Sequence, residues 1–279
     1  NESGGVIDDL MITRQAVNKF FLVINADCKA RDLQHLRENL QDLDIVYLED
    51  HGLLALQGPA AKDVIAEYVP DLQSMSFMQA REAEIAGIRT YISRSGYSGE
   101  DGFEISVAAA DAEKLARILL AHEAVEAVGL GARDSLRLEA GLCLYGHELN
   151  DEITPIEANL NWSISKSRRM GGEKEGGFPG ADIILKQMQN GVSKKRVGLL
   201  VDGRIPVREG AQLTSEQGNI IGKVSSGGFA PTMAAPIAIA FVDQENAQPG
   251  QILQALVRNK VIPVEVCRLP FVPQNYYRA

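Results

Sequence analysis

The chain has 279 residues, of which 45% are hydrophobic and 23% are charged, and its mean hydropathy is -0.08. These values are typical of a soluble globular protein with about two domains, and they exclude a disordered chain. The formal net charge of -9 argues against a nucleic-acid partner, because the chain as a whole repels phosphate backbones. The sequence contains no long apolar run, so we expect no membrane partner.

The cysteines and histidines are widely scattered along the sequence. Cys28, Cys143 and Cys267 show no CxxC spacing, which argues against a zinc knot and against a secreted disulfide framework. No HExxH motif occurs among the histidines, so no metal site is expected. Three unpaired thiols fit a reducing, cytosol-like compartment.

Strand-like and helix-like patterns mix in the first half of the chain. Apolar runs predict strands at Lys19–Asn25, Asp44–Glu49, Leu53–Gln57, Glu84–Arg94 and Gly102–Val107. The second and third of these are expected to form one hairpin, and the last two another. Helical spacing predicts helices at Lys29–Leu40, at Pro59–Tyr68, after an N-cap at Asp111, and at Ala132–Ala140. Hairpins mixed with helices favour an α+β fold with an antiparallel sheet.

The second half of the chain has a different composition. Residues 170–180 contain too many glycines for regular structure, so the domain boundary is placed near here. The predicted domains are 1–190, which could itself split into two lobes, and 191–279. Short strands are predicted at Val197–Val201, Ile220–Ser225, Ile237–Val242, Ile252–Val257 and Ile262–Leu269, which together indicate an all-β barrel or a jelly-roll-like domain.

Three glycine-rich segments come close to well-known motifs without matching them. Residues 218–224 lack the Ser or Thr of a P-loop, and residues 96–100 lack the closing glycine of a nucleophile elbow. Residues 129–134 carry only two glycines of the dinucleotide fingerprint. The sequence therefore favours neither hydrolase chemistry nor NAD binding.

Adjacent carboxylates occur in the segment GGVIDDL (4–10). In a strand, Asp8 and Asp9 point to opposite faces, so one of them can be partly buried. A carboxylate in a dry cavity has a raised pKa and can accept a proton from a weakly basic amine. An exposed acidic turn is the alternative interpretation of these two residues.

Several blocks of the sequence together resemble the aminomethyltransferase family, the T-proteins of the glycine cleavage system. The blocks span the chain in order: GGVIDDL (4–10), LLALQGPAA (53–61), SRSGYSGEDGFEISV (93–107), GLGARDSLRLEAGLCLYG (129–146), TPIEANLNW (154–162), FPGA (178–181) and LPFVPQNYY (269–277). The resemblance implies a folate-binding domain of the T-protein fold followed by a C-terminal barrel. It also implies that the family's N-terminal stretch before GGVIDDL, which forms part of the folate domain, is absent here.

The resemblance assigns roles to residues that match the family's motifs. Asp9 matches the catalytic aspartate, which orients the amine or accepts its proton and stabilises a developing iminium cation. Glu104 matches the residue that accepts hydrogen bonds from pterin N–H groups. The other folate-binding positions implied are Val23, Asn25, Tyr97, Arg133, Trp162, Arg196 and Tyr276. Two alternatives stay open: Arg133 held by Asp134 or Glu139 in a structural pair, and Trp162 packed in a core.

The implied reaction transfers a one-carbon unit. An aminomethyl group on the lipoyl arm of a carrier, the H-protein, loses ammonia, and tetrahydrofolate captures the methylene as 5,10-methylenetetrahydrofolate. Tetrahydrofolate is the co-substrate, and no metal, flavin or NAD is expected. The basic cluster Lys166, Arg168 and Arg169 is either a docking point for an acidic carrier or a solvated linker.

The compartment implied by the resemblance is the cytoplasm of a bacterium, or the mitochondrial matrix of a eukaryote. Two functional alternatives remain within the same fold. One is a non-enzymatic folate-binding module, which predicts loss of the catalytic acid, and the other is a folate-dependent demethylase, which differs in its one-carbon donor.

Overall fold

The computed structural model describes residues 1–258 and 260–278. The chain forms two compact units, and each is built from two separate segments. The barrel unit consists of Asn1–Asp9 and Arg137–Val272, and the sheet unit consists of Leu10–Leu136 and Pro273–Ala279. Every described helix is too short or too polar to cross a lipid bilayer. The predicted boundary near residue 190 stays a prediction from the sequence.

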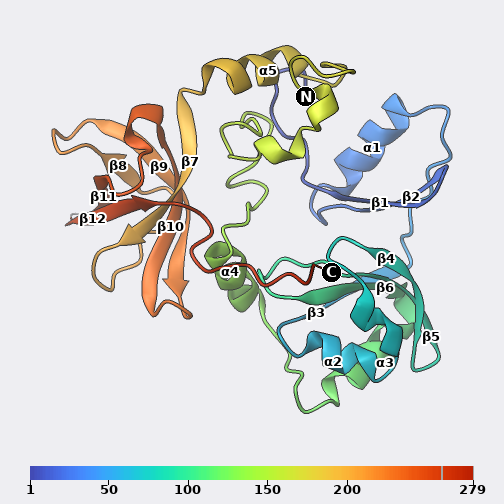
Figure 1. The fold of residues 1–279 in the computed structure, drawn as a ribbon. Helices are drawn as coiled ribbons and strands as arrows, with labels where there is room; N and C mark the ends of the chain where they lie inside the picture. Colours follow the sequence, from blue (N-terminus) through green and yellow to red (C-terminus); the bar gives the residue numbers. More distant parts are fainter. Residues whose placement is uncertain (259, 279) are drawn as a thin grey trace. The chain divides into compact units, whose positions relative to one another are not determined.

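The sheet unit is organised around a four-stranded antiparallel sheet (Figure 1). In the order β3-β6-β5-β4, its strands are His51–Gln57, Gly102–Ala108, Ile88–Ser93 and Ala80–Ile85. The helices α2 (Ala61–Ala66) and α3 (Ala109–Leu120) contact β6, and α3 also contacts β3. Side chains alternate along β6, so Phe103 and Ile105 join the apolar core while Glu104 and Ser106 lie on the opposite face.

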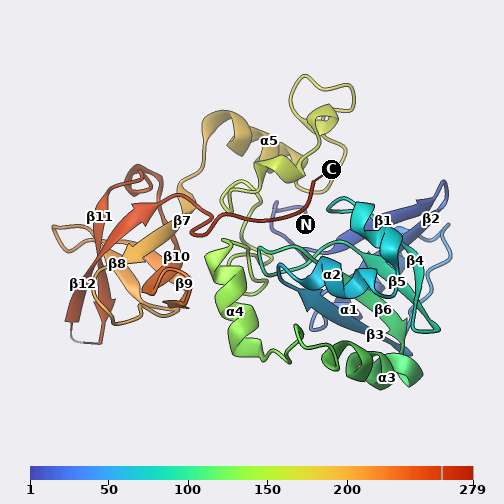
Figure 2. The same ribbon diagram turned by 60° about the horizontal axis from the view of Figure 1, so that its bottom comes forward.

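The sheet unit contains a second, smaller sheet. The strands β1 (Met11–Ala16) and β2 (Lys19–Val23) pair antiparallel, and α1 (Lys29–Asn39) follows them. The helix η1 (Pro70–Ser74) precedes β4. Helix α4 (Leu130–Glu139) includes the residues at which the chain passes from one unit to the other. Figure 2 shows these elements of the sheet unit from a second direction.

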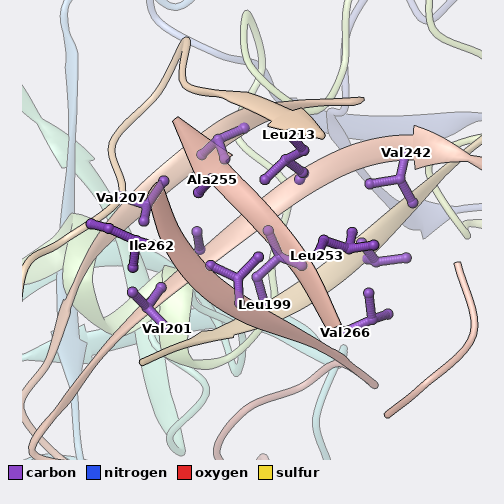
Figure 3. Close-up of a cluster of buried hydrophobic side chains, with 14 of the residues drawn as sticks. Leu199, Val201, Val207, Leu213, Val242, Leu253, Ala255, Ile262 and Val266 are labelled. Carbon is purple, nitrogen blue, oxygen red and sulfur yellow. The ribbon is translucent and has the colours of Figure 1, made fainter. Parts of the chain in front are cut away.

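The barrel unit contains a closed antiparallel barrel with the strand order β10-β7-β12-β11-β8-β9. In that order the strands are Ala235–Asp243, Lys194–Val201, Lys260–Cys267, Ile252–Val257, Gln212–Thr214 and Ile220–Ala230. Figure 3 shows that their inward side chains, among them Leu199, Leu213 and Leu253, fill the interior with aliphatic groups. The unit also contains α5 (Ala181–Asn190) and the helices η2 (Asn161–Ser163), η3 (Lys166–Arg168) and η4 (Gln244–Asn246).

The structure confirms the α+β class and the C-terminal all-β barrel. The predicted strands at Lys19–Asn25, Leu53–Gln57 and Gly102–Val107 and the five predicted barrel strands are present with small shifts at their ends. The predicted helices at Lys29–Leu40, Pro59–Tyr68 and Ala132–Ala140 correspond to α1, α2 and α4. Gly141, which follows α4, has the positive φ of 66° expected of a helix stop.

Four local predictions were wrong. Asp44–Glu49 is not a strand, because β3 pairs with β6 rather than with this segment. Glu84–Arg94 is not one strand, because Ala86 and Gly87 adopt positive φ and form a turn between β4 and β5. Helix α3 starts at Ala109 with Ala108 at the N-cap, so Asp111 lies in the first turn and not at the cap. Residues 4–10 form no strand, so strand alternation does not apply to the two adjacent aspartates.

Candidate active site

A pocket in the sheet unit lies between the β1–β2 hairpin and the face of the four-stranded sheet that is opposite α2 and α3. It is narrow in this structure, with a cavity volume of about 30 Å³. The lining is partly apolar and partly polar. Its residues are Met11, Ile12, Thr13, Phe21, Val23, Leu53, Met78, Tyr91, Ser93, Ser95, Glu104 and Ser106.

Glu104 is the only carboxylate among the residues that line this pocket. The hydroxyl of Ser95 donates a hydrogen bond of 2.6 Å to Oε2 of Glu104. Ser95 has a single hydroxyl proton, so in its 2.7 Å contact with Ser93 the Ser93 hydroxyl is the donor. The chain of donors ends on Glu104, which fixes one carboxylate oxygen and leaves Oε1 available to a ligand.

Aromatic rings form one wall of the pocket. Phe21 on β2 and Tyr91 on β5 lie with their ring centroids 4.6 Å apart and their planes tilted by 53°. Such tilted pairs are a favoured aromatic geometry and hold both rings in place. Val23 lies at the end of the same strand as Phe21, so a flat heterocycle bound near Glu104 would meet apolar surface on this side.

The loop after β5 is held in place by Gln57, the last residue of β3. Its Nε2 donates to the carbonyl of Ser95 at 3.0 Å, and its Oε1 accepts from the hydroxyl of Ser98 at 2.8 Å. A Cβ at Gly96 would lie 1.8 Å from Oε1 of Gln57, and a Cβ at Gly102 would lie 2.6 Å from its Nε2. A side chain at position 96 would therefore displace the glutamine side chain, whereas at position 102 the backbone carbonyl of Leu56, 2.5 Å from such a Cβ, also excludes a side chain.

A buried ion pair closes the same loop. Arg94 is fully buried and donates to both carboxylate oxygens of Asp101, from Nε at 2.9 Å and from Nη2 at 2.5 Å. Its Nη1 donates to the carbonyls of Gln73 and Met75. This fork fixes both ends of residues 95–100 and attaches them to η1 and to the residue that follows it. Neither Arg94 nor Asp101 was among the predicted site residues, although both lie in the block SRSGYSGEDGFEISV.

The predicted folate residues Tyr97 and Arg133 lie together. The guanidinium carbon of Arg133, on α4, lies 4.4 Å from the centre of the Tyr97 ring, as in a cation–π contact. The carboxylate of Glu139 instead accepts hydrogen bonds from the backbone and the hydroxyl of Thr232. A structural pair of Arg133 with Asp134 or Glu139 stays an alternative prediction.

Two other residues of the sheet unit that were predicted to bind folate, Tyr276 and Asn25, are not among the residues that line the pocket. Tyr276 stacks on Phe77 with ring centroids 4.1 Å apart and planes 9° apart, and burial raises the pKa of the Tyr276 hydroxyl. Asn25 follows β2 and is half-buried, but it is not among the residues that line the pocket.

In the barrel unit, the glycines of GGVIDDL allow a close backbone approach. The amide of Val6 donates to the carbonyls of Asn150 and Ile153. A Cβ at Gly5 would lie 1.8 Å from the carbonyl oxygen of Asp151, so only glycine fits there. This contact fixes the segment that ends at Asp9, whose side chain is exposed.

Arg196, at the start of the barrel, is a buried cation. Its Nη1 donates to the carbonyl of Gly141 at 3.2 Å and to the sulfur of Cys143 at 2.7 Å. Its Nε is buried and has no hydrogen-bond partner among the described residues. Burial raises the pKa of the Cys143 thiol to about 11, against the opposing positive charge of Arg196, and the negative charges of Glu148 and Asp9 also raise it.

Trp162 has 76% of its surface exposed, so the core-packing alternative for this residue was wrong.

A buried polar network that the sequence did not reveal connects residues 137 and 148 to the barrel. Arg137 donates to Glu148 at 3.0 Å and to Ser226 at 2.9 Å, and Ser225 also donates to Glu148. Both members of the ion pair are buried, so the block around residues 137–148 is attached to the barrel by charge-assisted bonds.

Two domain models of one protein family match the chain. A model of the GCVT N-terminal domain matches residues 1–168, and a model of the glycine cleavage T-protein C-terminal barrel domain matches residues 194–273. The mitochondrial aminomethyltransferase of Dictyostelium discoideum is 45% identical over 295 residues, which cover 99% of this chain and 72% of that protein. The chain belongs to the glycine cleavage T-protein family.

Two other members of the T-protein family also match the chain. The mitochondrial aminomethyltransferase of Pisum sativum is 43% identical and is covered over 69% of its length. The crystal structure of glycine cleavage system aminomethyltransferase T from Bartonella henselae matches with a TM-score of 0.91 at 42% identity, covering 100% of this chain and 75% of that one. The family, the T-protein fold and the aminomethyltransferase type of enzyme are thereby confirmed. The roles of individual residues stay predictions.

Proposed function

We propose that the chain transfers the methylene of a lipoyl-bound aminomethyl group to tetrahydrofolate, giving 5,10-methylenetetrahydrofolate and ammonia. The lipoyl arm is supplied by a carrier of the H-protein type, in a bacterial cytoplasm or a mitochondrial matrix. The observation that carries the proposal is the pocket of the sheet unit, in which one carboxylate is held by a serine beside an aromatic wall.

Glu104 binds the pterin in this proposal. A pterin edge presents parallel N–H groups, and a carboxylate accepts such a pair well. The hydrogen bond from Ser95 restricts rotation of the carboxylate before the ligand arrives, which lowers the entropy lost on binding. Phe21, Tyr91 and Val23 cover the ring with apolar surface.

Asp9 is the proposed catalytic residue. In the reaction the carbon loses its bonds to the ammonia nitrogen and the lipoyl sulfur and gains two bonds to folate nitrogens, so no net redox step occurs. Positive charge develops on this carbon, which becomes part of an iminium-like cation. The carboxylate of Asp9 orients the amine, accepts or returns its proton and stabilises this cation electrostatically.

The remaining predicted positions contact the outer part of the folate. Arg196 offers a buried guanidinium, whose positive charge suits an anionic group of the folate. Tyr97 and Arg133 offer a stacked pair of planar groups. Trp162 offers a large exposed ring, and Asn25 and Tyr276 complete the predicted set.

Calorimetric titration with tetrahydrofolate tests the proposal. We expect saturable binding by the unsubstituted chain, loss of at least about tenfold in affinity for Glu104→Ala, and little change for Asp9→Ala, whose turnover with an aminomethylated carrier is lost. Glu84→Ala, an exposed carboxylate on β4, is the matched control. Unchanged affinity in Glu104→Ala would refute the pterin assignment, and turnover of a free methylated amine instead of the carrier would identify a demethylase.

A further inference from the structure

The described C-terminal residues 273–278, here called the strap, belong to the sheet unit although the barrel precedes them in the sequence. The strap contacts two segments that border the pocket. One is the loop 96–101, which carries Tyr97, and the other is the segment 75–79, which carries the pocket residue Met78. Of the strap residues, only Tyr276 was predicted as a site residue from the sequence.

Asn275 connects the strap to the loop 96–101 by two hydrogen bonds. Its backbone amide donates to the carbonyl of Gly99 at 2.8 Å. Its side-chain Nδ2 donates to Oε1 of Glu100 at 2.6 Å. Because both bonds come from one residue, Asn275 fixes the position and the direction of the loop relative to the strap.

Tyr277 connects the strap to the segment 75–79. Its carbonyl accepts a 2.7 Å hydrogen bond from the amide of Phe77, whose ring stacks on the neighbouring Tyr276. Met78, the next residue, has a positive φ of 71°, which is uncommon for a side chain of this kind. The hydrogen bond at Phe77 therefore helps to hold a backbone conformation that brings Met78 to the pocket.

Tyr277 also covers the buried arginine of the loop. The guanidinium carbon of Arg94 lies 4.2 Å from the centre of the Tyr277 ring and 5.3 Å from the centre of the Phe103 ring. A cation between two aromatic rings is shielded from water, which strengthens its bonds to Asp101. The ring of Tyr277 makes this contact with Arg94, so the ring is the group that matters.

We propose that Asn275 and Tyr277 are positioning residues for folate binding. The strap holds the loop 96–101 and the segment 75–79 in the conformation that the pocket requires, so the ligand does not have to order them. This inference rests on the proposed function for its link to tetrahydrofolate. The mechanical part, that the strap orders the two segments, is independent of any ligand.

The test uses the full chain with Tyr277→Ala, Asn275→Ala and the double variant. Hydrogen exchange without ligand is expected to become about tenfold faster at amides of 75–79 and 96–101 in the double variant, with the barrel strand β10 unchanged. Titration is expected to give about tenfold weaker tetrahydrofolate binding. In turnover assays the KM for tetrahydrofolate rises by about the same factor while kcat changes less than about twofold.

Two control variants separate positioning from general damage. Tyr277→Phe keeps the ring, so we expect its exchange and affinity to stay near those of the unsubstituted chain. Asn246→Ala removes the side-chain oxygen that accepts a 3.0 Å hydrogen bond from Gln251 in the barrel unit. This substitution is expected to change neither the hydrogen exchange nor the affinity.

The outcomes distinguish the inference from the proposed function. Unchanged exchange in the double variant overturns the strap, whatever the affinity for folate. Faster exchange with unchanged affinity and KM overturns its coupling to binding. If the unsubstituted chain binds no tetrahydrofolate while exchange in the double variant is faster, the proposed function fails and the ordering of the two segments by the strap is supported.

Discussion

Replacement of Arg94 by methionine should destabilise the sheet unit strongly. The substitution keeps a long side chain but removes the donors to Asp101, Gln73 and Met75. The side chain of Asp101 is only 13% exposed, so water replaces little of what it loses. Removing one partner of a buried ion pair costs about 3–5 kcal/mol, and the remaining exposure of Asp101 favours the lower end of that range.

A second arginine of the same unit provides a matched control. Arg81 contacts Asp71 at 2.5 Å, the same distance as between Arg94 and Asp101, but the two side chains are 39% and 68% exposed. The hydrogen bond from Arg81 lowers the pKa of Asp71, yet solvent screens an exposed pair. Arg81→Met should therefore leave the free energy of unfolding unchanged within error, so the comparison isolates burial.

Native-state hydrogen exchange is the appropriate assay, because a chain with two units does not guarantee two-state unfolding. The free energy of opening is measured at amides of β5 and β6. A decrease of less than about 1 kcal/mol in Arg94→Met would refute the reasoning. The double variant Arg94→Met/Asp101→Asn should recover part of the loss, because it leaves no unpaired buried charge.

Three further predictions concern single sites. Ser95→Ala should weaken tetrahydrofolate binding about tenfold in a calorimetric titration, whereas Thr90→Val, which removes a hydroxyl bond from the same sheet's other face, should not. Gly96→Ala should weaken that binding, because the Gln57 side chain must move and lose its bonds to Ser95 and Ser98, and retained full affinity would contradict this role of Gly96. Because burial raises the pKa of Cys143 from 9.0 to about 11, the unfolded chain loses its proton first, so urea titrations should show stability falling as the pH rises from 9 to 11. Cys143→Ala should show a smaller fall.

The sequence was informative where local patterns decide the outcome. The barrel strands follow from alternating apolar residues between turn residues, and the family motifs identified Glu104 before its pocket was known. The sequence patterns do not show which residues far apart in the chain contact each other. Nothing in the pattern of Asp44–Glu49 reveals that β3 takes its partner from β6, and an alanine at positive φ, as at Ala86, contradicts local preference.

Structural residues of the site were missed for the same reason. Arg94 and Gln57 act through backbone carbonyls and loop groups that are far away in sequence, such as Met75 and Ser98. Gly96 lies against the Gln57 side chain and Gly102 against the backbone of Leu56, and neither contact can be read from the local sequence. In the sequence, such a supporting side chain is indicated only by a glycine that is flanked by polar residues in a block shared with the family.

The strap has a consequence for the order of folding. The bond between Asn275 and Glu100 joins residues that are 175 positions apart. Closing so long a loop costs conformational entropy before any contact compensates for it, so contacts of this kind form late unless intervening parts fold first. During synthesis the β5–β6 hairpin leaves the ribosome long before Asn275. The rim of the pocket should therefore acquire its final order only after the barrel strands have been made, and the sheet unit should mature in two kinetic steps.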